Sequence, residues 1–352
     1  QMSNSIKVGK KIIGEKKPCF IVAEISANHN GKFADAIKLI KEAKKSGADA
    51  VKIQTYTPDT ITLDSKNKDF LISKKSPWSK YGNLYNLYKF AHTPWKWHKK
   101  MKQTANKIGI ELFSSPFDLT AVDFLTKLKM NIYKVASPEI NDLELLKKIA
   151  KTKKPVILSS GLADFKQLKN SVSFLKKNKC KDIILLKCLT SYPAPKNESN
   201  LKTMVDMKKK FNCLVGISDH SLGYDIPCIS VAMGAKVIEK HFKLNNNLKT
   251  PDSFFSLNPK EFSKMVKEIR NIETVMGNIN YDLSDSSKKN IHSLRSIYVS
   301  KNIKKGEKFT LKNTKSVRPG FSLNPKDYNK ILGKNSSKKF IVGDRIKLND
   351  AY

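Results

Sequence analysis

Two histidines close two neighbouring apolar runs of the sequence. His220 follows the run in "LVGISD", and His241 lies near the end of "KVIEKHF". A structural zinc site normally takes four protein ligands, whereas two imidazoles leave positions open for water and substrate. The pair therefore indicates a divalent metal that takes part in chemistry. A single histidine at a strand end is more often a satisfied core residue, so this interpretation depends on what surrounds the pair.

Two lysines inside apolar runs extend the pattern. Lys52 lies within "DAVKIQTY" and Lys134 within "IYKVAS", where a buried ammonium group is costly unless it meets an anion. Together with the hydroxyls of Ser137, Ser159, Ser160 and Ser218, they suit a ligand that carries a phosphate and a carboxylate. A metal that polarises a carbonyl beside such a pocket predicts carbon–carbon bond formation from an enol phosphate.

The elements that must position these residues are short strands, which recur along the first two thirds of the chain. Eight β-branched or aromatic runs cover 20–26, 49–56, 110–117, 132–137, 155–161, 182–188, 213–219 and 236–242. Amphipathic helical patterns lie between most of them, as in "FADAIKLIKEAKKSG" at 33–47. This α/β alternation, repeated eight times, is typical of a (β/α)8 TIM barrel.

Polar residues gather at the carboxyl end of nearly every predicted strand. They are Glu24, Lys52, Gln54, Ser114, Ser115, Lys134, Ser137, Ser159, Ser160, Thr190, Ser218 to His220, and Glu239 to His241. In a TIM barrel these ends form the rim where active sites are built. Packing offers no comparable explanation for eight strands that all turn polar at one end, so the pattern predicts an active site.

One interval between predicted strands is too long for a simple loop. Residues 57–109 contain the aromatic stretch "SPWSKYGNLYNLYKFAHTPWKWH", which predicts an inserted lid or pocket wall. Tyr81, Tyr85 and Tyr88 follow one another at helical spacing, a pattern more often found in a packed core than in a sugar-binding surface. Their position in the insert nevertheless makes them candidates for selectivity.

A second, smaller domain is expected after the barrel. Residues 279–290 form a polar linker, and 291–352 contain a faint repeat, "IKKGEKFTLKN" and "FIVGDRIKLND". A Gly-acid turn repeated between short strands predicts a compact β-rich domain with internal pseudo-symmetry. Between the two repeats, Arg318 precedes a Pro-Gly pair. On sequence alone, a surface arginine in a turn is as good an interpretation as a functional one.

The formal net charge of +36 raises the question of nucleic acid. We expect no such partner, because lysine is spread along the chain and only Arg270, Arg295, Arg318 and Arg345 supply the better base-reading side chain. The remaining effect is a positive field that gathers anionic substrates. The five scattered cysteines predict reduced thiols and a cytoplasmic protein, and no apolar run is long enough to span a membrane.

Several of these stretches together resemble the N-acetylneuraminate synthase family. The carrying motifs are "IVAEISANHNG", "VKIQTY", "FSSPFD", "YKVASPEI", "ILSSGL", "LLKCLTSYPAP", "GISDHSLG", "VIEKHF" and "SVRPG", in consistent order from about residue 8 to the C-terminus. The resemblance implies a TIM-barrel domain at 1–278, a linker at 279–290 and a small antifreeze-like (SAF, β-clip) domain at 291–352.

Within this family, "NLYNLYKFAHTPWKWH", "FSSPFDLTAVDFL" and "TPDSFFSL" resemble the pseudaminic acid branch more than the neuraminic or legionaminic branches. That likeness implies condensation of phosphoenolpyruvate with 2,4-diacetamido-2,4,6-trideoxy-L-altrose, giving pseudaminic acid and phosphate. It also implies a domain-swapped homodimer, in which Arg318 would reach the sugar's N-acetyl end in a partner subunit.

The resemblance further implies roles for individual residues. His220 and His241 would hold Mn²⁺ or Mg²⁺, with Co²⁺ as a further candidate, and Glu24 would orient or deprotonate water or a sugar hydroxyl. The phosphoenolpyruvate residues would be Lys52, Ser115, Lys134, Ser137, Ser159, Ser160, Thr190 and Ser218. The sugar residues would be Gln54, Glu139, Tyr192, Asp252 and Arg318. Ser115 stands where many relatives have Thr, and Thr190 stands where sialate synthases commonly have Asn.

Two alternatives remain on sequence grounds. A sister synthase would use N-acetylmannosamine or a manno-configured diacetamido sugar and make N-acetylneuraminate or legionaminate, and a substrate assay separates it from the leading hypothesis. A non-catalytic barrel whose SAF-like domain docks partners belongs to another class. It is disfavoured because none of the strand-end motifs is degraded.

Overall fold

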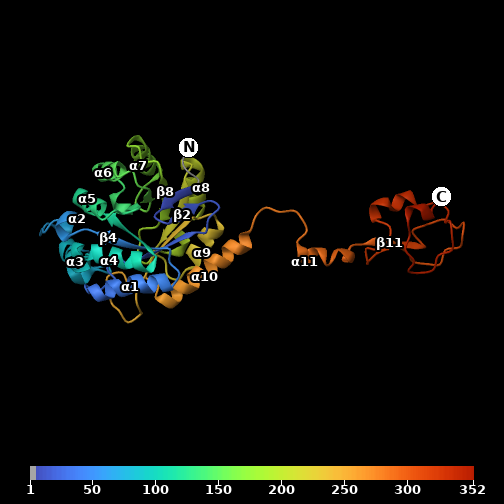
Figure 1. The fold of residues 1–352 in the computed structure, drawn as a ribbon, viewed down its shortest axis with the longest axis horizontal. Coiled ribbons are helices and arrows are strands. Elements are labelled where there is room, and N and C mark those ends of the chain that lie inside the picture. The colour runs from blue at the N-terminus through green and yellow to red at the C-terminus, as the bar shows by residue number, and fades with distance from the viewer. Residues whose placement is uncertain (1–4) are drawn as a thin grey trace. The chain divides into compact units, whose positions relative to one another are not determined.

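The chain divides into two compact units, Gln1–Gly277 and Asn278–Tyr352, in a computed structural model that describes residues 5–352 (Figure 1). The first four residues of the expected barrel domain lie outside the described residues. Each unit has its own hydrophobic core. The first unit carries almost all of the predicted site residues.

Eight parallel strands of the first unit close into a barrel in the order β10-β3-β4-β5-β6-β7-β8-β9. The strands are β3 Phe20–Glu24, β4 Ala50–Thr55, β5 Glu111–Pro116, β6 Tyr133–Val135, β7 Val156–Ser159, β8 Ile183–Cys188, β9 Leu214–Asp219 and β10 Val237–His241. Every one of the eight predicted runs contains one of these strands, which confirms the predicted (β/α)8 barrel.

Helices surround the barrel (Figure 1). They are α1 Phe33–Lys45, α4 Trp95–Ile108, α5 Leu119–Lys127, α6 Leu143–Lys151, α7 Phe165–Lys177, α8 Lys202–Phe211, α9 Asp225–Ala232 and α10 Pro259–Met276. Most are amphipathic and bury one face against the strands, as α6 does through Leu145, Leu146 and Ile149. This burial fixes the strands and therefore the side chains at their carboxyl ends.

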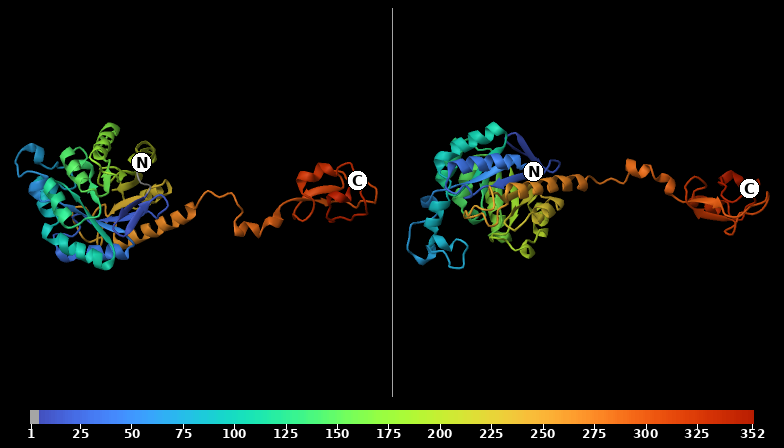
Figure 2. Two further views of the ribbon diagram at one scale, coloured as in Figure 1. Left: turned by 45° about the horizontal axis from the view of Figure 1, so that its top comes forward. Right: turned by 90° about the horizontal axis from the view of Figure 1, so that it is seen from below.

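The interpretation of 57–109 as one long insert is wrong in its second half. Helix α4 buries His98, Met101 and Ala105, packs beside α1 and belongs to the regular ring of barrel helices. The apolar face is hard to recognise in the sequence because lysines and tryptophans interrupt its helical pattern. The true insert is 57–94, with α2 Pro58–Ile61, two short 3₁₀ turns and α3 Leu84–Ala91. Figure 2 shows the α2 segment standing out from the barrel.

An antiparallel hairpin precedes the barrel and was not predicted. Its strands are β1 Ser5–Val8 and β2 Lys11–Gly14. Ile6, Val8 and Ile13 share one buried cluster with strand residues such as Phe20 and Val237. Because side chains alternate along a strand, Val237 faces the same way as Glu239 and His241. The hairpin therefore packs on the apolar layer inside the barrel, and the polar layer lies nearer the carboxyl ends.

The second unit has a small core made of Ile297, Val299, Ile303, Phe309, Leu323, Ile331, Phe340 and Ile346. Its strands β11 Ser296–Val299 and β12 Thr314–Val317 are antiparallel. The two sequence repeats adopt equivalent turns. Gly306 and Gly343 both have positive φ, 82° and 92°, and the acid that follows each glycine accepts a backbone N–H three residues earlier.

The first residues of the two repeats also pair directly. Ile303 and Phe340 exchange backbone hydrogen bonds of 3.0 and 2.9 Å. The internal repeat is therefore a structural one, and the antifreeze-like assignment of the unit stays a prediction.

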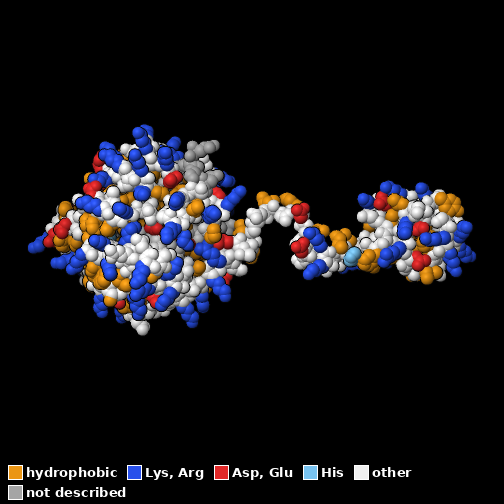
Figure 3. Space-filling view, viewed as in Figure 1, with side chains coloured by type: hydrophobic (Ala, Val, Ile, Leu, Met, Phe, Trp, Pro, Cys, Tyr) orange, Lys and Arg blue, Asp and Glu red, His pale blue; other side chains and the backbone are white. Residues whose placement is uncertain are grey.

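Surface lysines are spread over the visible face of each unit instead of forming one patch (Figure 3). Within residues 5–352, no helix is long and apolar enough to cross a membrane.

Candidate active site

The two histidines predicted to hold a metal lie together at the ends of β9 and β10. Their ring centroids are 5.3 Å apart. Phe255, from the loop after β10, packs edge-on against both rings at 5.8 and 4.7 Å. Neighbouring parallel strands and this shared aromatic support fix the spacing of the two imidazoles.

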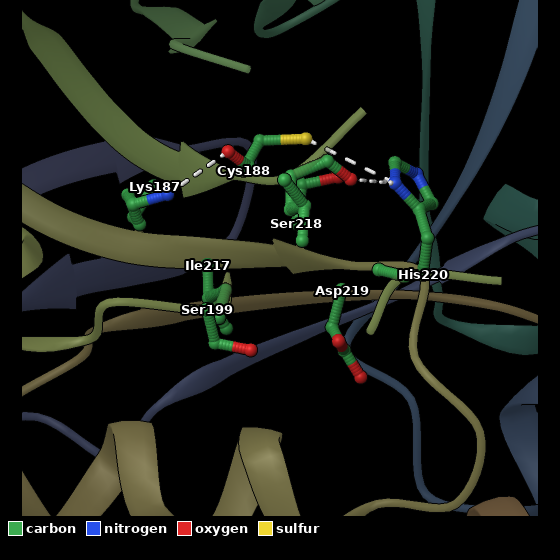
Figure 4. A pocket seen from close by; sticks show the side chains of 9 residues that line it. Lys187, Cys188, Ser199, Ile217, Ser218, Asp219 and His220 are labelled. Atoms are coloured by element: carbon green, nitrogen blue, oxygen red, sulfur yellow. Dashed lines mark hydrogen bonds between the residues drawn. The ribbon is translucent and has the colours of Figure 1, made fainter. Parts of the chain in front are cut away.

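His220 is oriented by its Nδ1 atom, which lies 3.0 Å from the Leu189 carbonyl oxygen and 3.9 Å from Cys188 Sγ (Figure 4). An Nδ1–H that donates to the carbonyl leaves the Nε2 lone pair free to bind a metal. Burial alone would lower the pKa of His220, but the neighbouring Cys188 outweighs it and raises this pKa. Burial likewise would raise the pKa of Cys188, but His220 lowers it to about 7.

His241 is buried, and its Nδ1 has no hydrogen-bond partner among residues 5–352. The nearest acid is Asp252, whose Oδ2 lies 4.0 Å from this atom. Burial, followed by the effect of His220, lowers the pKa of His241 well below its usual value, so the ring is neutral. A neutral imidazole with a free nitrogen is the form that binds a divalent metal.

The donor set therefore fits a metal with an open coordination sphere. Across residues 5–352, no group of three or more His, Cys, Asp or Glu side chains forms a complete metal cage. Two imidazoles would leave positions for water and a substrate oxygen, which suits a catalytic ion better than a structural one.

Inside the barrel, two lysines and two glutamates form a buried ion-pair network. Lys52 Nζ lies 3.0 Å from Glu24 Oε2 and 2.9 Å from Glu239 Oε1. Lys134 Nζ lies 3.7 Å from the same Glu239 oxygen. Glu239 is therefore the common counter-charge of both lysines, and Ser218 adds a hydrogen bond of 3.1 Å to it.

The electrostatics of this network favour an incoming anion. Burial raises the pKa of Glu24 to about 7, against the lowering effect of Lys52. Burial would also raise the pKa of Glu239, but Lys134 and Lys52 lower it to about 2. Burial lowers the pKa of Lys134 to about 8. Near neutral pH, two ammonium groups thus face one fully ionised carboxylate and one partly protonated carboxyl group.

Two of the serine hydroxyls predicted to bind the ligand are buried and have no hydrogen-bond partner among residues 5–352. Ser115 Oγ, on β5, and Ser159 Oγ, on β7, have no hydrogen-bond partner within the described part of the chain. Buried hydroxyls are normally satisfied. Their position at the same rim as the lysines suits ligand oxygens as the missing partners.

A cradle lies at Gly161, just after β7. A Cβ there would lie 2.2 Å from Thr190 Oγ1 and 2.7 Å from Ser137 Oγ, so only glycine fits. The Gly161 N–H donates to Ser137 Oγ over 2.9 Å. Two predicted phosphate-binding hydroxyls thus converge on a backbone that a ligand can approach closely. Ser160 differs, because its hydroxyl donates to the Leu186 carbonyl oxygen over 3.1 Å.

Three of the five predicted sugar residues lie beside Glu24 or His220. Gln54 Nε2 lies 3.4 Å from Glu24 Oε1 and 3.3 Å from Ser26 Oγ, and the Ser26 hydroxyl donates to Asp252. The Tyr192 ring centroid lies 4.5 Å from that of His220. Tyr192 and Asp252 therefore flank the histidine pair, and Gln54 lies on the side of Glu24.

Two other sugar candidates differ in their setting. Burial raises the pKa of Glu139 to about 7, and Glu139 Oε2 has no hydrogen-bond partner among residues 5–352. Arg318 belongs to the second unit and precedes a cis proline, Pro319. It is not among the residues that the barrel itself brings together.

Three features of the site were missed as candidates. The sequence pattern predicts Glu239 only as a polar strand end, although its position on the same strand face as His241 is a signal for a site residue. Ser26 has a left-handed φ of 42° and donates its N–H to Glu24 Oε1 over 3.0 Å, which no sequence pattern predicts. The third is the buried Lys240–Asp219 pair, 2.6 Å apart. It joins β9 and β10 directly before the two histidines.

Glu239 gives a first prediction, on stability. Glu239→Gln is expected to lower the free energy of unfolding of the full chain by about 3–5 kcal/mol, because Lys52 and Lys134 lose their shared buried counter-charge. The Lys196–Asp225 pair offers a control, since its side chains are each 49% exposed. Asp225→Asn should cost less than about 1 kcal/mol. Equal urea midpoints for Glu239→Gln and the wild type would contradict the assigned role.

Taken together, the eight-stranded barrel and its rim of lysines, hydroxyls and paired histidines define a TIM-barrel enzyme site for an anionic substrate. The model of the NeuB family matches residues 39–281. The chain belongs to the NeuB family.

Known relatives extend this likeness over most of the chain. A pseudaminic acid synthase of Campylobacter jejuni is 48% identical over 334 residues, covering 95% of this chain and 97% of the relative. An N,N'-diacetyllegionaminic acid synthase of the same species is 40% identical, covering 94% and 99%. The crystal structure of an N-acetylneuraminic acid synthetase from Leptospira borgpetersenii, in complex with citrate, is 33% identical with a TM-score of 0.73, covering 83% of this chain and 96% of that one.

Proposed function

We propose that this protein is a pseudaminic acid synthase, which condenses phosphoenolpyruvate with 2,4-diacetamido-2,4,6-trideoxy-L-altrose and releases phosphate. The observation that carries the proposal is the 48% identity, over 95% of the chain, to a curated pseudaminic acid synthase. The buried lysines and unused hydroxyls of the barrel rim add a chemical reason, since they match a ligand with both a phosphate and a carboxylate.

Phosphoenolpyruvate binds inside the barrel, at the carboxyl ends of the strands. Lys52, Lys134 and the free hydroxyls of Ser115 and Ser159 supply charge and donors, and the cradle of Ser137, Gly161 and Thr190 accepts the phosphate. The Ser218 hydroxyl already donates a hydrogen bond to Glu239 and so holds that carboxylate in place. A small rotation of the side chain would let the same hydroxyl donate to the ligand. The positive lysines offset the substrate's negative charges in a buried site.

His220 and His241 hold a divalent ion, Mn²⁺ or Mg²⁺, with Co²⁺ as a further candidate. When bound, the ion would polarise the aldehyde of the open-chain sugar. The chain's own contribution is to orient both imidazoles, through the Leu189 carbonyl and the Phe255 ring, and to keep the His241 ring neutral by burial.

The bond-forming step joins C3 of phosphoenolpyruvate to the aldehyde carbon of the sugar. The electron pair of the enol double bond forms the new bond and leaves positive charge at C2, while the π pair of the aldehyde C=O moves to its oxygen, which takes up a proton and becomes a hydroxyl. Water adds at C2 and loses a proton, and the resulting tetrahedral centre breaks its C2–O bond to phosphate, loses the hydroxyl proton and leaves C2 as the keto carbon of the product. Glu24 has a pKa near neutrality and contacts Lys52 and Gln54, so it orients that water or the sugar hydroxyl and takes its proton.

The alternative function is that of an N-acetylneuraminate or legionaminate synthase, which would use the same chemistry on a different sugar. A legionaminic acid synthase is 40% identical to this chain, eight percentage points below the pseudaminic relative. Gln54, Glu139, Tyr192 and Asp252 face the sugar in either case, so the choice between branches depends on the residues around them.

The small domain and the assembly are also part of the proposal. The second unit is an antifreeze-like domain, supported by its paired repeat turns, and two chains form a domain-swapped homodimer in which Arg318 contacts the partner's sugar. The five cysteines are all free, which supports a reducing, cytoplasmic location. Light scattering should give a dimer, and a monomer that retains full activity would contradict this arrangement.

Phosphate release tests the reaction and its metal together. With Mn²⁺, phosphate should form from phosphoenolpyruvate only when the altrose-configured sugar is present, and EDTA should abolish it because the polarising ion is removed. Added Mn²⁺ in excess of the chelator should restore the rate, which separates metal removal from unfolding. Full activity after exhaustive chelation would contradict the metal, and release with N-acetylmannosamine alone would favour the sister activity.

A further inference from the structure

The insert 57–94 is anchored on the rim of the barrel. Leu87 and Ala91 of α3 form a buried cluster with Ala27, which lies three residues beyond Glu24. Trp78, Tyr81 and Tyr88 pack against this cluster. The insert therefore presents aromatic side chains beside the candidate active site.

Trp78 connects the insert to two other loops of the rim. Its Nε1 donates to the Pro251 carbonyl oxygen over 2.9 Å, next to Asp252. Its ring lies edge-on to Tyr192 at 5.4 Å and tilted against Phe254 at 6.2 Å. Because the Tyr192 ring in turn contacts His220, Trp78 is separated from a candidate metal ligand by a single aromatic ring.

Tyr88 reaches the same region from α3. Its ring packs edge-on against Tyr56 at 5.4 Å. Burial raises the pKa of the Tyr88 phenol, and the carboxylates of Glu139 and Asp252 raise it further. These two carboxyl groups follow β6 and β10. The hydroxyl of Tyr88 makes no hydrogen bond within the described residues, so it remains available to a ligand in their field.

Tyr85, one turn earlier on the same helix, is the natural comparison. Its hydroxyl donates to Asp59 Oδ1 over 3.0 Å at a surface position. The two phenols therefore share a helix and a residue type. They differ in whether the hydroxyl is already paired and in whether it lies near the candidate sugar residues.

The chemistry of the proposed sugar suits the aromatic surface formed by Trp78 and Tyr88. A 2,4-diacetamido-2,4,6-trideoxy sugar carries a methyl group at C6 and an acetyl methyl on each acetamido group, whereas N-acetylmannosamine has hydroxyls at C4 and C6. Methyl groups gain more from contact with aromatic rings than hydroxyls do. An unpaired phenol can donate to an acetamido carbonyl.

We propose that Trp78 and Tyr88 determine sugar specificity: the Trp78 ring packs against methyl groups of the substrate, and the Tyr88 hydroxyl donates to a polar group of the same sugar. This inference rests on the proposed function and assigns its selectivity to the insert. Neither residue takes part in bond formation, so both act on sugar binding and positioning.

The matched pair Tyr88→Phe and Tyr85→Phe tests the phenol. Loss of one hydrogen bond should lower kcat/KM for the diacetamido altrose by about 3- to 10-fold in Tyr88→Phe. Tyr85→Phe should stay within about 2-fold of the wild type, since a surface substitution of this kind has a small effect. The KM for phosphoenolpyruvate should not change in either variant. Equal effects of the two substitutions, or a KM change for phosphoenolpyruvate alone, would overturn the assignment.

Trp78→Leu tests the apolar wall. The ratio of kcat/KM for the diacetamido altrose to that for N-acetylmannosamine should fall about 10-fold or more, because an aromatic contact with several methyl groups is lost. Thermal unfolding of the variant separates this loss from misfolding. An unchanged ratio in a folded, active variant would overturn the specificity role. Failure of the proposed function would look different, because the wild type itself would then not turn over the altrose sugar.

Discussion

Replacement of His220 or His241 by alanine is expected to lower kcat/KM by about 10³-fold or more, because Lewis-acid stabilisation by a metal is worth several kcal/mol and each 1.36 kcal/mol is a factor of ten. Both rings are buried side by side, and either truncation leaves a single imidazole. The apparent affinity for Mn²⁺, measured by electron paramagnetic resonance of the free ion, should fall in parallel with activity.

His92→Ala is the matched control for this prediction. His92 lies in the insert, and its Nδ1 lies 2.9 Å from the Lys89 carbonyl oxygen, its one hydrogen-bond contact among residues 5–352. Its removal should leave both Mn²⁺ affinity and turnover within about 2-fold of the wild type, as expected for a surface change. A His220→Ala protein that binds Mn²⁺ and turns over like His92→Ala would exclude the metal assignment.

Glu24→Gln is expected to lower kcat by about 10²- to 10⁴-fold, the usual contribution of a positioned acid–base group. The KM for phosphoenolpyruvate should change little, because Lys52 keeps its 2.9 Å contact with Glu239 in the variant. Steady-state kinetics with each substrate varied in turn separates the two parameters.

Glu139→Gln provides the comparison for Glu24. Burial raises the pKa of both carboxyls to about 7, but Glu139 has no lysine within ion-pair distance among residues 5–352. We expect its replacement to raise the KM for the sugar more than it lowers kcat. If Glu24→Gln altered only substrate KM values, the proton-transfer role of Glu24 would be wrong.

The barrel was predictable because its signal is repeated. Each strand is short, β-branched and bounded by turn residues, and eight of them at regular intervals leave few alternative folds. The rim residues followed from the same regularity, since the carboxyl ends of all parallel strands meet at one edge. Glu24, Lys52, Lys134, His220 and His241 are therefore close in the structure although they lie far apart in the chain.

The predictions that were wrong concern two individual elements and not the barrel. The sequence pattern places helix α4 in the insert because Trp95, Trp97 and the lysines of the helix mask a buried face made of His98, Met101 and Ala105. The β1–β2 hairpin has strands of only four residues each, too short for a periodic signal. Both errors concern elements whose identity is decided by packing on the barrel and not by their own sequence.

The exact partners inside the site were also beyond the sequence. A pattern can place Glu239 and Lys52 on strands, but only the closed barrel brings their side chains to 2.9 Å. Similarly, the convergence of Ser137 and Thr190 on Gly161 depends on three different strand ends. Residue types led to the hypothesis about the ligand, and the fold supplied the contacts between the side chains.

The identity of the nine-carbon acid that the protein makes from competing sugars tests the proposed function directly. The protein would be incubated with phosphoenolpyruvate, Mn²⁺ and equal concentrations of three sugars: the altrose-configured diacetamido sugar, its manno-configured isomer and N-acetylmannosamine. Chromatography and NMR of the products should show pseudaminic acid as the main acid, formed in equal amount to phosphate. A main product of legionaminic or N-acetylneuraminic acid, or phosphate without any nine-carbon acid, would contradict the account.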